Sequence, residues 1–285
     1  MSGNLTLRIG NVNISIESDI QECEPAPPSS YRPFVSAGKS DISLRLRHGL
    51  IDTRDAQRVF DCPPIWTLYH RNKTSIINIF SDMSGLERTL VLSDSLESTD
   101  LFFNSRSDRA IDPFFGPVIE LLMVSYLAQG RGIIVHGCGI ARNEKGILFI
   151  GESGAGKSTL AKLWHEEYGV EPLSDDRLIV RKEGKKFWMY GTPWHGDARF
   201  GTPQSVEVER ILFLKQGREN STEEIRGIEA APKLISCAFP PHWDTAGMAF
   251  TLDFFGNLAD RVLCQTLSFK PDRSAIDFVI AGLGS

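Results

Sequence analysis

ILFIGESGAGKSTL, at Ile147–Leu160, has the order of a strand, a glycine-rich loop and a helix. Its first four residues are apolar and suit a buried parallel strand. The residues that follow fit the pattern G-x-x-x-x-G-K-[ST], and a helical run continues from Ser158 to Tyr168. The motif therefore stands in the strand–loop–helix context that a phosphate-binding loop needs.

The chemistry of phosphate binding explains the spacing of this motif. Glycines allow backbone angles that other residues avoid, so successive amide N–H groups can turn toward a phosphate chain. The start of the helix adds its positive dipole end, Lys157 can reach the β- and γ-phosphates, and the Ser158 hydroxyl can bind Mg²⁺. A glycine-rich turn that binds nothing does not require so many fixed positions. We therefore expect a nucleoside triphosphate to contact Gly151, Glu152, Ser153, Gly154, Ala155, Gly156, Lys157, Ser158 and Thr159.

The composition excludes several other classes of protein. The 285 residues carry a net charge of −5, which argues against a general affinity for nucleic acid or for anionic membranes. No apolar run reaches the roughly 18 residues of a membrane-spanning helix, and the start lacks the pattern of a signal peptide. The five cysteines are scattered without a C-x-x-C pair, which favours reduced thiols. We expect a cytoplasmic protein.

The first part of the chain alternates apolar and polar residues in short runs, which predicts an antiparallel β-rich module over residues 1–104. Three of its aspartates, Asp52, Asp55 and Asp61, are typical loop and turn carboxylates, and a metal site is the alternative. The runs are Leu5–Ile16, Ile42–Leu46, Ile65–Tyr69, Ile76–Phe80 and Thr89–Leu92.

The pattern then changes to alternating helices and strands, which predicts an α/β domain over residues 105–285. Asp112 suits an N-cap and Pro113 a first helical residue, so a helix should run from there to Gly130. A short strand, Ile133–Val135, leads to His136. Further strands are predicted at 178–180, 185–190 and 211–214, and helices at 228–238 and 244–259.

Acidic residues accompany the loop. Asp175 and Asp176 follow Lys157 by about one strand–helix unit, so they should lie near the phosphates. One carboxylate could hold Mg²⁺ and the other could accept a proton from an attacking hydroxyl. A solvated turn balanced by Arg177 is the structural alternative, and for His136 it is a histidine that caps a strand end.

These motifs together resemble the catalytic core of the bacterial HPr kinase/phosphorylase family. The family has a His-Gly strand end, a G-[ED]-S-G-x-G-K-S loop and an A-D-D-R segment. Here His136-Gly137, the loop at Gly151 and Ser174–Arg177 match them. The intervals of 21 residues from His136 to Lys157 and 18 from Lys157 to Asp175 are also similar. The segment Lys270–Ser274 resembles the family's R-P-G-R-N, so Lys270 and Arg273 are further candidates.

The resemblance implies a P-loop kinase domain that uses ATP and Mg²⁺. Carried over by position, Asp175 would be the general base, with His136 assisting it. Lys157 would bind the β- and γ-phosphates, and Ser158 would bind Mg²⁺ with support from Asp176. Family members often form hexamers, so a homo-oligomer is compatible with the resemblance, although nothing else in the chain requires one.

The chain departs from the family at an E-[IL]-R-G segment that supplies a metal-binding Glu and an Arg. Trp188–Gly191 stands there instead. Asp197 or Asp176 could replace the Glu, and His195 or Arg199 the Arg; a polar surface loop is the alternative. The Arg segment is associated with the reverse reaction, so we do not expect phosphorylase activity.

The predicted function is therefore an ATP- and Mg²⁺-dependent phosphotransferase with an alcohol-group acceptor, resembling the divergent members of the family that phosphorylate a peptide serine. The acceptor is a hydroxyl of a peptide, a protein or a small molecule. The alternative is a nucleotide-binding switch, or a pseudo-kinase that acts through a protein partner. An N-K-x-D motif for guanine is absent from the sequence, and Pro172 interrupts the apolar run that a Walker-B strand would need.

Overall fold

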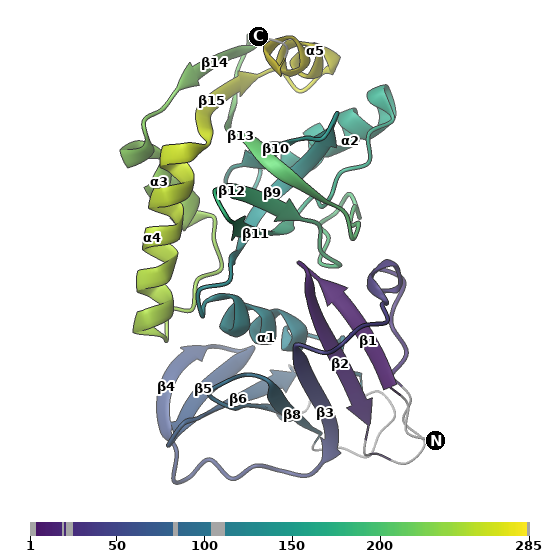
Figure 1. Ribbon diagram of the computed structural model, residues 1–285, viewed down its shortest axis with the longest axis vertical. Coiled ribbons are helices and arrows are strands. Elements are labelled where there is room, and N and C mark those ends of the chain that lie inside the picture. The colour runs from purple at the N-terminus through teal and green to yellow at the C-terminus, as the bar shows by residue number, and fades with distance from the viewer. Residues whose placement is uncertain (1–3, 19, 21–24, 82–84, 104–111, 284–285) are drawn as a thin grey trace. The chain divides into compact units, whose positions relative to one another are not determined.

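We describe the chain from a computed structural model, and the description covers residues 4–18, 20, 25–81, 85–103 and 112–283. The chain divides into two compact units, Met1–Tyr126 and Leu127–Ser285. Each unit has its own sheet, so the protein is a mixed α/β chain with two sheets (Figure 1). The predicted boundary between residues 104 and 105 lies within residues 104–111, which are outside the described residues, and it stays a prediction.

The first unit is built on a sheet with the strand order β1-β2-β3-β8-β7-β6-β5-β4. Alternate apolar side chains such as Ile14, Leu44 and Leu101 are fully buried, as in a sheet with one face in a core. The elements are β1 (Asn4–Ile9), β2 (Val12–Ser18), the 3₁₀ turn η1 (Arg32–Phe34), β3 (Ile42–His48), β4 (Gln57–Cys62), β5 (Trp66–Arg71), β6 (Thr74–Ser81), β7 (Gly85–Leu92), β8 (Ser98–Phe103) and α1 (Val118–Leu127).

The prediction that this sheet is antiparallel was wrong. β3 pairs in parallel with both β2 and β8, so the sheet is mixed. Parallel neighbours need a long connection between them, and residues 19–41 provide one between β2 and β3. The alternation also failed to reveal β4, because its side chains are exposed or only half-buried and carry no apolar period.

Helix α1 begins later than the sequence predicts. Asp112 does not cap a helix; its Oδ1 accepts the backbone N–H of Phe114 at 2.9 Å within a turn. Gly116 follows with a φ of 72°, a left-handed conformation that cannot continue a right-handed helix. The helix therefore starts at Val118.

The second unit contains a closed circuit of strands. β10 pairs with β9 on one edge and with β13 on the other. β9 also pairs with β11, β11 with β12, and β12 with the first residues of β13. β15 and β14 continue the sheet from the far end of β13. The strands are β9 (Ile133–Arg142), β10 (Lys145–Ile150), β11 (Arg177–Glu183), β12 (Lys186–Tyr190), β13 (Ser205–Gln216), β14 (Ser221–Glu224) and β15 (Leu263–Phe269).

Two hydrophobic clusters flank this circuit. One joins α2 (Lys157–Tyr168) and α5 (Arg273–Leu283) to the strands through fully buried residues such as Trp164 and Phe149. The other joins the strands to α3 (Gly227–Ser236) and α4 (Thr245–Arg261), which lie side by side in Figure 1. The helices predicted at 228–238 and 244–259 are confirmed by α3 and α4 to within a few residues.

Strand β9 is longer than the predicted Ile133–Val135, because it continues through Gly137 and Gly139 to Arg142. A Cβ on Gly137 would lie 2.9 Å from the carbonyl oxygen of Phe149, and one on Gly139 would lie 3.0 Å from Leu178. Glycine here permits close packing between neighbouring strands. The strand therefore carries His136 in its interior instead of ending at that residue.

The register of these strands places the motifs beside one another. Gly137 of β9 pairs with Ile150, the last residue of β10, and His136 pairs with Arg177, the first residue of β11. One end of the sheet therefore carries the phosphate loop that follows Ile150. The same end carries His136 and the two aspartates that precede Arg177. The aspartates reach the loop from the start of an antiparallel strand.

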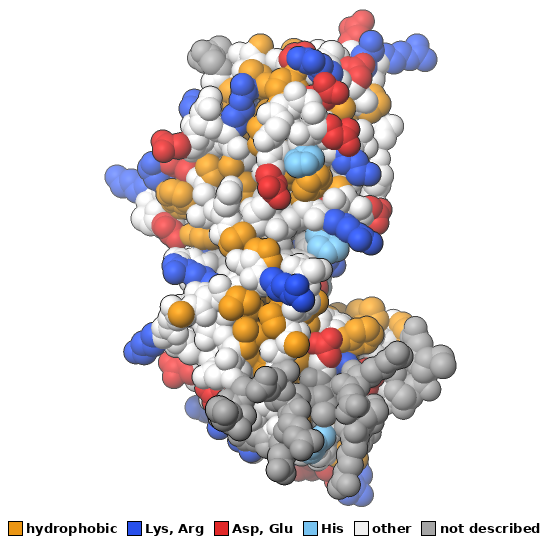
Figure 2. Space-filling view, turned by 90° about the vertical axis from the view of Figure 1, so that its right-hand side faces the viewer, with side chains coloured by type: hydrophobic (Ala, Val, Ile, Leu, Met, Phe, Trp, Pro, Cys, Tyr) orange, Lys and Arg blue, Asp and Glu red, His pale blue; other side chains and the backbone are white. Residues whose placement is uncertain are grey.

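The surface carries charges of both signs. On the face shown in Figure 2, acidic and basic side chains are interspersed, which is usual for a globular domain. Among the described residues, no helix is long and apolar enough to cross a membrane.

Candidate functional site

The loop between β10 and α2 has the backbone that the glycines predict. Gly154 has a φ of 82° and Gly156 a φ of 106°, conformations that favour glycine. A Cβ on Gly156 would lie only 2.7 Å from Cζ of Phe269. The backbone N–H of Ala155 donates to the carbonyl oxygen of Glu152 at 3.1 Å, which closes a tight turn. Glycine is therefore required at Gly156 both by the backbone and by packing.

Lys157 lies across this loop. The residue is 6% exposed, and its Nζ donates to the carbonyl oxygens of Gly151 at 2.6 Å and Glu152 at 3.0 Å. Burial lowers the pKa of the ammonium, although the nearby Asp176 carboxylate favours its charged form. The ammonium is thus fixed above the first residues of the loop, where it can contact a phosphate.

His136, Asp176 and Arg177 form a hydrogen-bonded group beside the loop. Nδ1 of His136 lies 3.0 Å from Oδ1 of Asp176, and Arg177 donates to Oδ2 of the same carboxylate at 2.5 Å. Burial would raise the pKa of Asp176, but the hydrogen bond to His136 and the charge of Arg177 outweigh it. The pKa of this carboxyl therefore lies below its usual value, and the group is an anion at neutral pH.

Asp175 has a different environment. It is 2% exposed, and its Oδ1 accepts the backbone N–H groups of Gly196 at 3.0 Å and Phe200 at 3.2 Å. Its Oδ2 accepts the N–H of Ala198 at 2.9 Å. A carboxylate has about four lone-pair sites, so about one remains for other partners. Asp175 therefore anchors the 196–200 loop, whatever else it does.

A cavity of about 350 Å³ unites most of the predicted residues. The loop and the start of α2 form one wall, and the carboxylates with His136 form the other. Its lining residues are His136, Ser153, Gly154, Gly156, Lys157, Ser158, Thr159, Asp175, Asp176, Gly196 and Asp197. The arrangement offers backbone donors and an ammonium for phosphates and, opposite them, carboxylates that can take up a proton or hold a cation.

Seven of the candidates do not line this cavity: Gly151, Glu152 and Ala155 in the first part of the phosphate loop, and four residues outside that loop. His195 and Arg199 are exposed on the 191–202 loop, where His195 Nδ1 lies 3.1 Å from the carbonyl oxygen of Gly196. Lys270 is exposed, and Arg273 lies 3.5 Å from Glu167 and stacks over Tyr168 on the far end of α2. Roles for these four residues stay predictions.

The donor set suits Mg²⁺ that binds together with a nucleotide. The cavity presents the Ser158 hydroxyl and the carboxylates of Asp176 and Asp197, all oxygen ligands of the kind that Mg²⁺ prefers. Within the described ranges, no cluster of three or more His, Cys, Asp or Glu residues could hold a metal by itself. Mg²⁺ commonly takes one or two carboxylates and completes its shell with water and substrate phosphates, which fits these residues.

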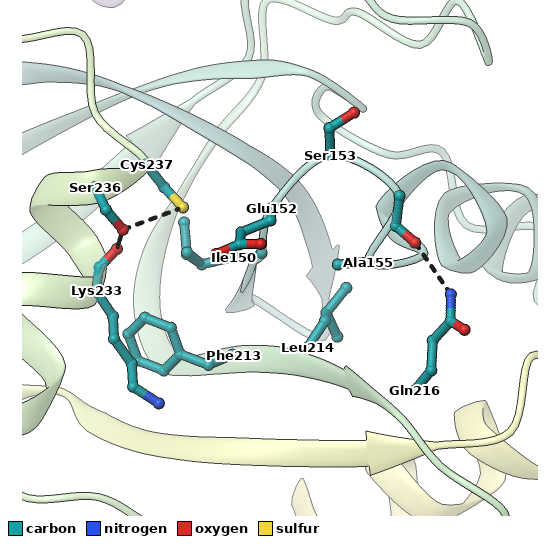
Figure 3. A pocket seen from close by; sticks show the side chains of 12 residues that line it. Ile150, Glu152, Ser153, Ala155, Phe213, Leu214, Gln216, Lys233, Ser236 and Cys237 are labelled. Atoms are coloured by element: carbon teal, nitrogen blue, oxygen red, sulfur yellow. Dashed lines mark hydrogen bonds between the residues drawn. The ribbon is translucent and has the colours of Figure 1, made fainter.

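A second cavity, of about 420 Å³, adjoins the loop on the side of β13 and α3 (Figure 3). Ser153 and Gly154 line both cavities. The remaining walls consist of apolar side chains from the ends of β10 and β13 and polar side chains from α3. The lining residues are Ile150, Gly151, Glu152, Ser153, Gly154, Ala155, Phe213, Leu214, Gln216, Lys233, Ser236 and Cys237.

Cys138 is not a candidate nucleophile. Cys138, on β9, is fully buried, and burial raises the pKa of its thiol, with the charge of Asp175 adding to the effect. The thiol therefore stays protonated, whereas a reactive cysteine needs a thiolate.

This chain has distant similarity to an ATP-binding protein and to a kinase of known structure. No protein-family model matches it. Over 161 residues the chain is 29% identical to the zinc import ATP-binding protein ZnuC 1 of Hahella chejuensis (strain KCTC 2396). The aligned region covers 56% of this chain and 55% of that protein. The chain thus spans about half the length of this curated relative. A solved structure, the Hpr(Ser) kinase/phosphatase from Coxiella burnetii, matches 52% of this chain and 94% of its own at 13% identity and a TM-score of 0.32. That score is too low to carry an argument.

The sequence did not predict the residues that hold the site residues in place. Gly196 lines the first cavity, where a Cβ would lie 2.9 Å from Oδ2 of Asp175. The Ser174 hydroxyl accepts the N–H groups of Asp176 and Arg177, both at 3.2 Å, and so bends the chain before β11. Ser174 stood in a recognisable motif, but no sequence signal marks Gly196 or the α3 residues of the second cavity.

Proposed function

We propose that this protein is an ATP- and Mg²⁺-dependent kinase that transfers the γ-phosphoryl group to a hydroxyl, in particular to a serine of a peptide or protein. The observation that carries the proposal is the first cavity. It holds a phosphate loop with Lys157 and Ser158 on one side and the Asp175–Asp176 pair with His136 on the other. Phosphoryl transfer to an alcohol requires this combination of phosphate binding, charge neutralisation and proton acceptance.

The distant relative supports ATP as the nucleotide, because its name describes an ATP-binding protein. The loop residues supply the binding chemistry. Lys157, Ser158 and Thr159 at the start of α2 line the cavity, where a helix N-terminus favours anions, and Lys157 lies where it can contact the β- and γ-phosphates. Ser158, Asp176 and Asp197 would hold Mg²⁺, which when bound neutralises charge on the transferring phosphoryl group.

The reaction needs little covalent chemistry from the protein. The acceptor oxygen forms a bond to the γ-phosphorus while the bond from that phosphorus to the β–γ bridging oxygen breaks. ADP leaves with the electron pair of the bridging oxygen. The proton of the acceptor hydroxyl passes to a carboxylate of the cavity, for which the resemblance assigns Asp175. The chain's contribution is to align the two oxygens and to stabilise the charge between them.

The hydrogen bonds of Asp175 change how this assignment is tested. In Asp175→Asn, an NH₂ group would face backbone N–H donors of the 196–200 loop, so lost activity alone would not identify a base. Asp176→Asn removes a carboxylate that is held by side chains and leaves those loop contacts in place. The two variants must therefore be compared for transfer, nucleotide affinity and loop order together.

The test is transfer from γ-labelled ATP with Mg²⁺ to serine peptides, HPr and free L-serine. We expect label on a serine-bearing acceptor with the wild-type protein. We also expect the rate to fall at least a hundredfold, the lower range for a lost acid–base group, in Asp175→Asn or Asp176→Asn, with ATP affinity changed much less in at least one of them. Asp253→Asn, at an exposed aspartate of α4, is the matched control.

The competing function is a nucleotide-dependent switch or pseudo-kinase that acts through a protein partner. A switch or pseudo-kinase would bind ATP but would place no label on any acceptor, and that result would contradict the proposed kinase function. Full transfer activity in both Asp175→Asn and Asp176→Asn would contradict the proposed mechanism.

A further inference from the structure

The second cavity lies at one particular end of the phosphate loop. It is lined by Gly151 to Ala155, the first part of the loop, and by none of Lys157, Ser158 or Thr159. The first cavity, in contrast, is lined by all three of these residues, which form the start of α2. The two cavities meet at Ser153 and Gly154, which line both.

The position of Lys157 fixes the direction of a bound triphosphate. The lysine of this motif reaches the β- and γ-phosphates, and here its Nζ lies against the carbonyl oxygens of Gly151 and Glu152. The γ-phosphate therefore belongs near the first part of the loop, and the rest of the nucleotide extends toward the start of α2. In-line transfer requires the acceptor oxygen to approach opposite the leaving oxygen. Ser153 and Gly154 line both cavities, so an acceptor held in the second cavity would bring its hydroxyl to the γ-phosphate at these two residues, where the first cavity, which carries the carboxylates, begins.

The walls of this cavity suit part of a peptide. Ile150, Phe213 and Leu214 give it an apolar floor. Lys233 and Ser236 of α3 stand on one side and Gln216 on the other, as Figure 3 shows. The volume of about 420 Å³ falls in the range of sites that enclose ligands much larger than one serine.

The polar groups of the cavity differ in how firmly they are held. Gln216 Nε2 donates to the carbonyl oxygen of Gly154 at 3.0 Å, and Ser236 Oγ donates to that of Lys233 at 2.9 Å. The Lys233 ammonium lies 5.6 Å from the centre of the Phe213 ring, and its side chain is exposed. Lys233 is therefore a cation beside an apolar floor and can pair with an anionic group of a ligand. The exposed Glu152 carboxylate also lines this cavity and disfavours an anion near the loop, so the anionic group belongs on the side of α3.

We propose that the second cavity receives the acceptor, and that the acceptor is a peptide segment whose serine is flanked by an apolar residue and an acidic residue. The apolar side chain lies on Ile150, Phe213 and Leu214, the carboxylate pairs with Lys233, and the serine hydroxyl reaches the γ-phosphate at Ser153 and Gly154. This inference rests on the proposed kinase function. It adds a binding site and a substrate class that the phosphate loop alone does not define.

The test reverses the charge of Lys233 and measures which peptides are phosphorylated. Serine peptide libraries carry Glu, Lys or Ala at each position near the serine, with Leu or Ser at a second position. They are assayed with the wild-type protein and with Lys233→Glu. Lys182→Glu is the matched control, because Lys182 is also an exposed lysine over an aromatic ring, 5.9 Å from the centre of Phe187, and lies outside both cavities.

We expect the wild-type protein to prefer Glu over Lys near the serine, and Lys233→Glu to reverse the preference. The change in relative kcat/KM should be about tenfold, as expected when an exposed attractive pair becomes a repulsive one. Lys182→Glu should keep the wild-type preference. A second variant, Ser236→Trp, should fill the cavity and raise the KM for the peptide without changing the affinity for ATP or for inorganic tripolyphosphate.

Three results would overturn the inference. The first is an unchanged Glu-to-Lys preference in Lys233→Glu. The second is a Ser236→Trp variant that binds ATP more weakly but tripolyphosphate normally, since the cavity would then hold the nucleoside. The third is equal transfer to free serine and to peptides. If the wild-type protein transfers label to no acceptor at all, the proposed function itself fails, and the inference fails with it.

Discussion

Lys157 is the residue on which phosphate binding depends most directly. Replacing it by Met keeps an apolar stem of similar length but removes the ammonium that bonds Gly151 and Glu152. A charge-assisted hydrogen bond contributes about 1.5–3 kcal/mol, so we expect ATP affinity to fall about 10- to 100-fold. Isothermal titration calorimetry measures this, with Lys162→Met, at an exposed position of the same helix, as the control. Equal ATP affinity in Lys157→Met and wild type would remove the lysine from the site.

Asp175 should have a structural role that is separable from catalysis. Asp175→Asn loses part of the carboxylate that accepts three loop N–H groups, so we expect about 2 kcal/mol or more of lost stability. Amide hydrogen exchange at Gly196, Ala198 and Phe200 should accelerate. Asp197→Asn, exposed on the same loop, should leave these amides protected. Unchanged exchange in Asp175→Asn would show that the carboxylate does not hold the loop.

At the scale of single residues, the sequence predicted most of the residues that line the first cavity, but it did not predict which groups hydrogen-bond to one another there. The loop, His136 and the two aspartates were predicted because a phosphate-binding motif fixes residue types at fixed spacings. The partners of Asp175 were not predictable, because they are backbone N–H groups and leave no trace in side-chain identity. The pairing of His136 with Asp176 depends on the register of β9 and β11, which the local sequence does not specify.

The loop and the elements that flank it form one packed unit, and its two left-handed glycines should not tolerate substitution equally. Gly154→Ala places a Cβ in open space, so its only cost is the left-handed backbone, about 1–2 kcal/mol. Gly156→Ala has a comparable backbone cost and also overlaps Phe269 at 2.7 Å, which adds about 1–3 kcal/mol. Urea unfolding should rank Gly156→Ala as the less stable variant.

A further variant isolates the packing term. Phe269→Leu in the Gly156→Ala background should recover part of the lost stability, because it shortens the overlapping side chain. The same substitution beside Gly154→Ala should only destabilise. Equal stabilities of the two alanine variants would contradict the packing of β15 against the loop.

Elements with a strong local signal were predicted, and those that depend on distant pairing were not. The helix after the loop and helices α3 and α4 were predicted because apolar spacing is a local feature of the sequence. The parallel pairings of β3 and the closed circuit through β10 and β13 join segments far apart in sequence. The extension of β9 through Gly137 and Gly139 was not predicted, because these glycines permit close contact with Phe149 and Leu178, which only the packed structure reveals.

At the scale of the whole molecule, every residue of the two cavities belongs to the second unit. Saturating ATP with Mg²⁺ should therefore slow amide hydrogen exchange in residues 127–285 first, above all at 151–159. A ligand at 100 times its Kd stabilises the folded state by about 2.7 kcal/mol, which is ample for detection. Protection confined to residues 4–103 would place the nucleotide elsewhere.

The proposed kinase transfers the γ-phosphoryl group to a hydroxyl instead of releasing it to water. The most direct measurement follows the fate of the γ-phosphoryl group in one reaction, with labelled ATP, Mg²⁺ and a serine peptide that carries an acidic and an apolar neighbour. We predict that most label appears on the peptide serine and that this transfer is lost in Asp176→Asn. Label that appears only as inorganic phosphate, at a rate independent of the peptide, would contradict the account and identify a nucleotide hydrolase or switch.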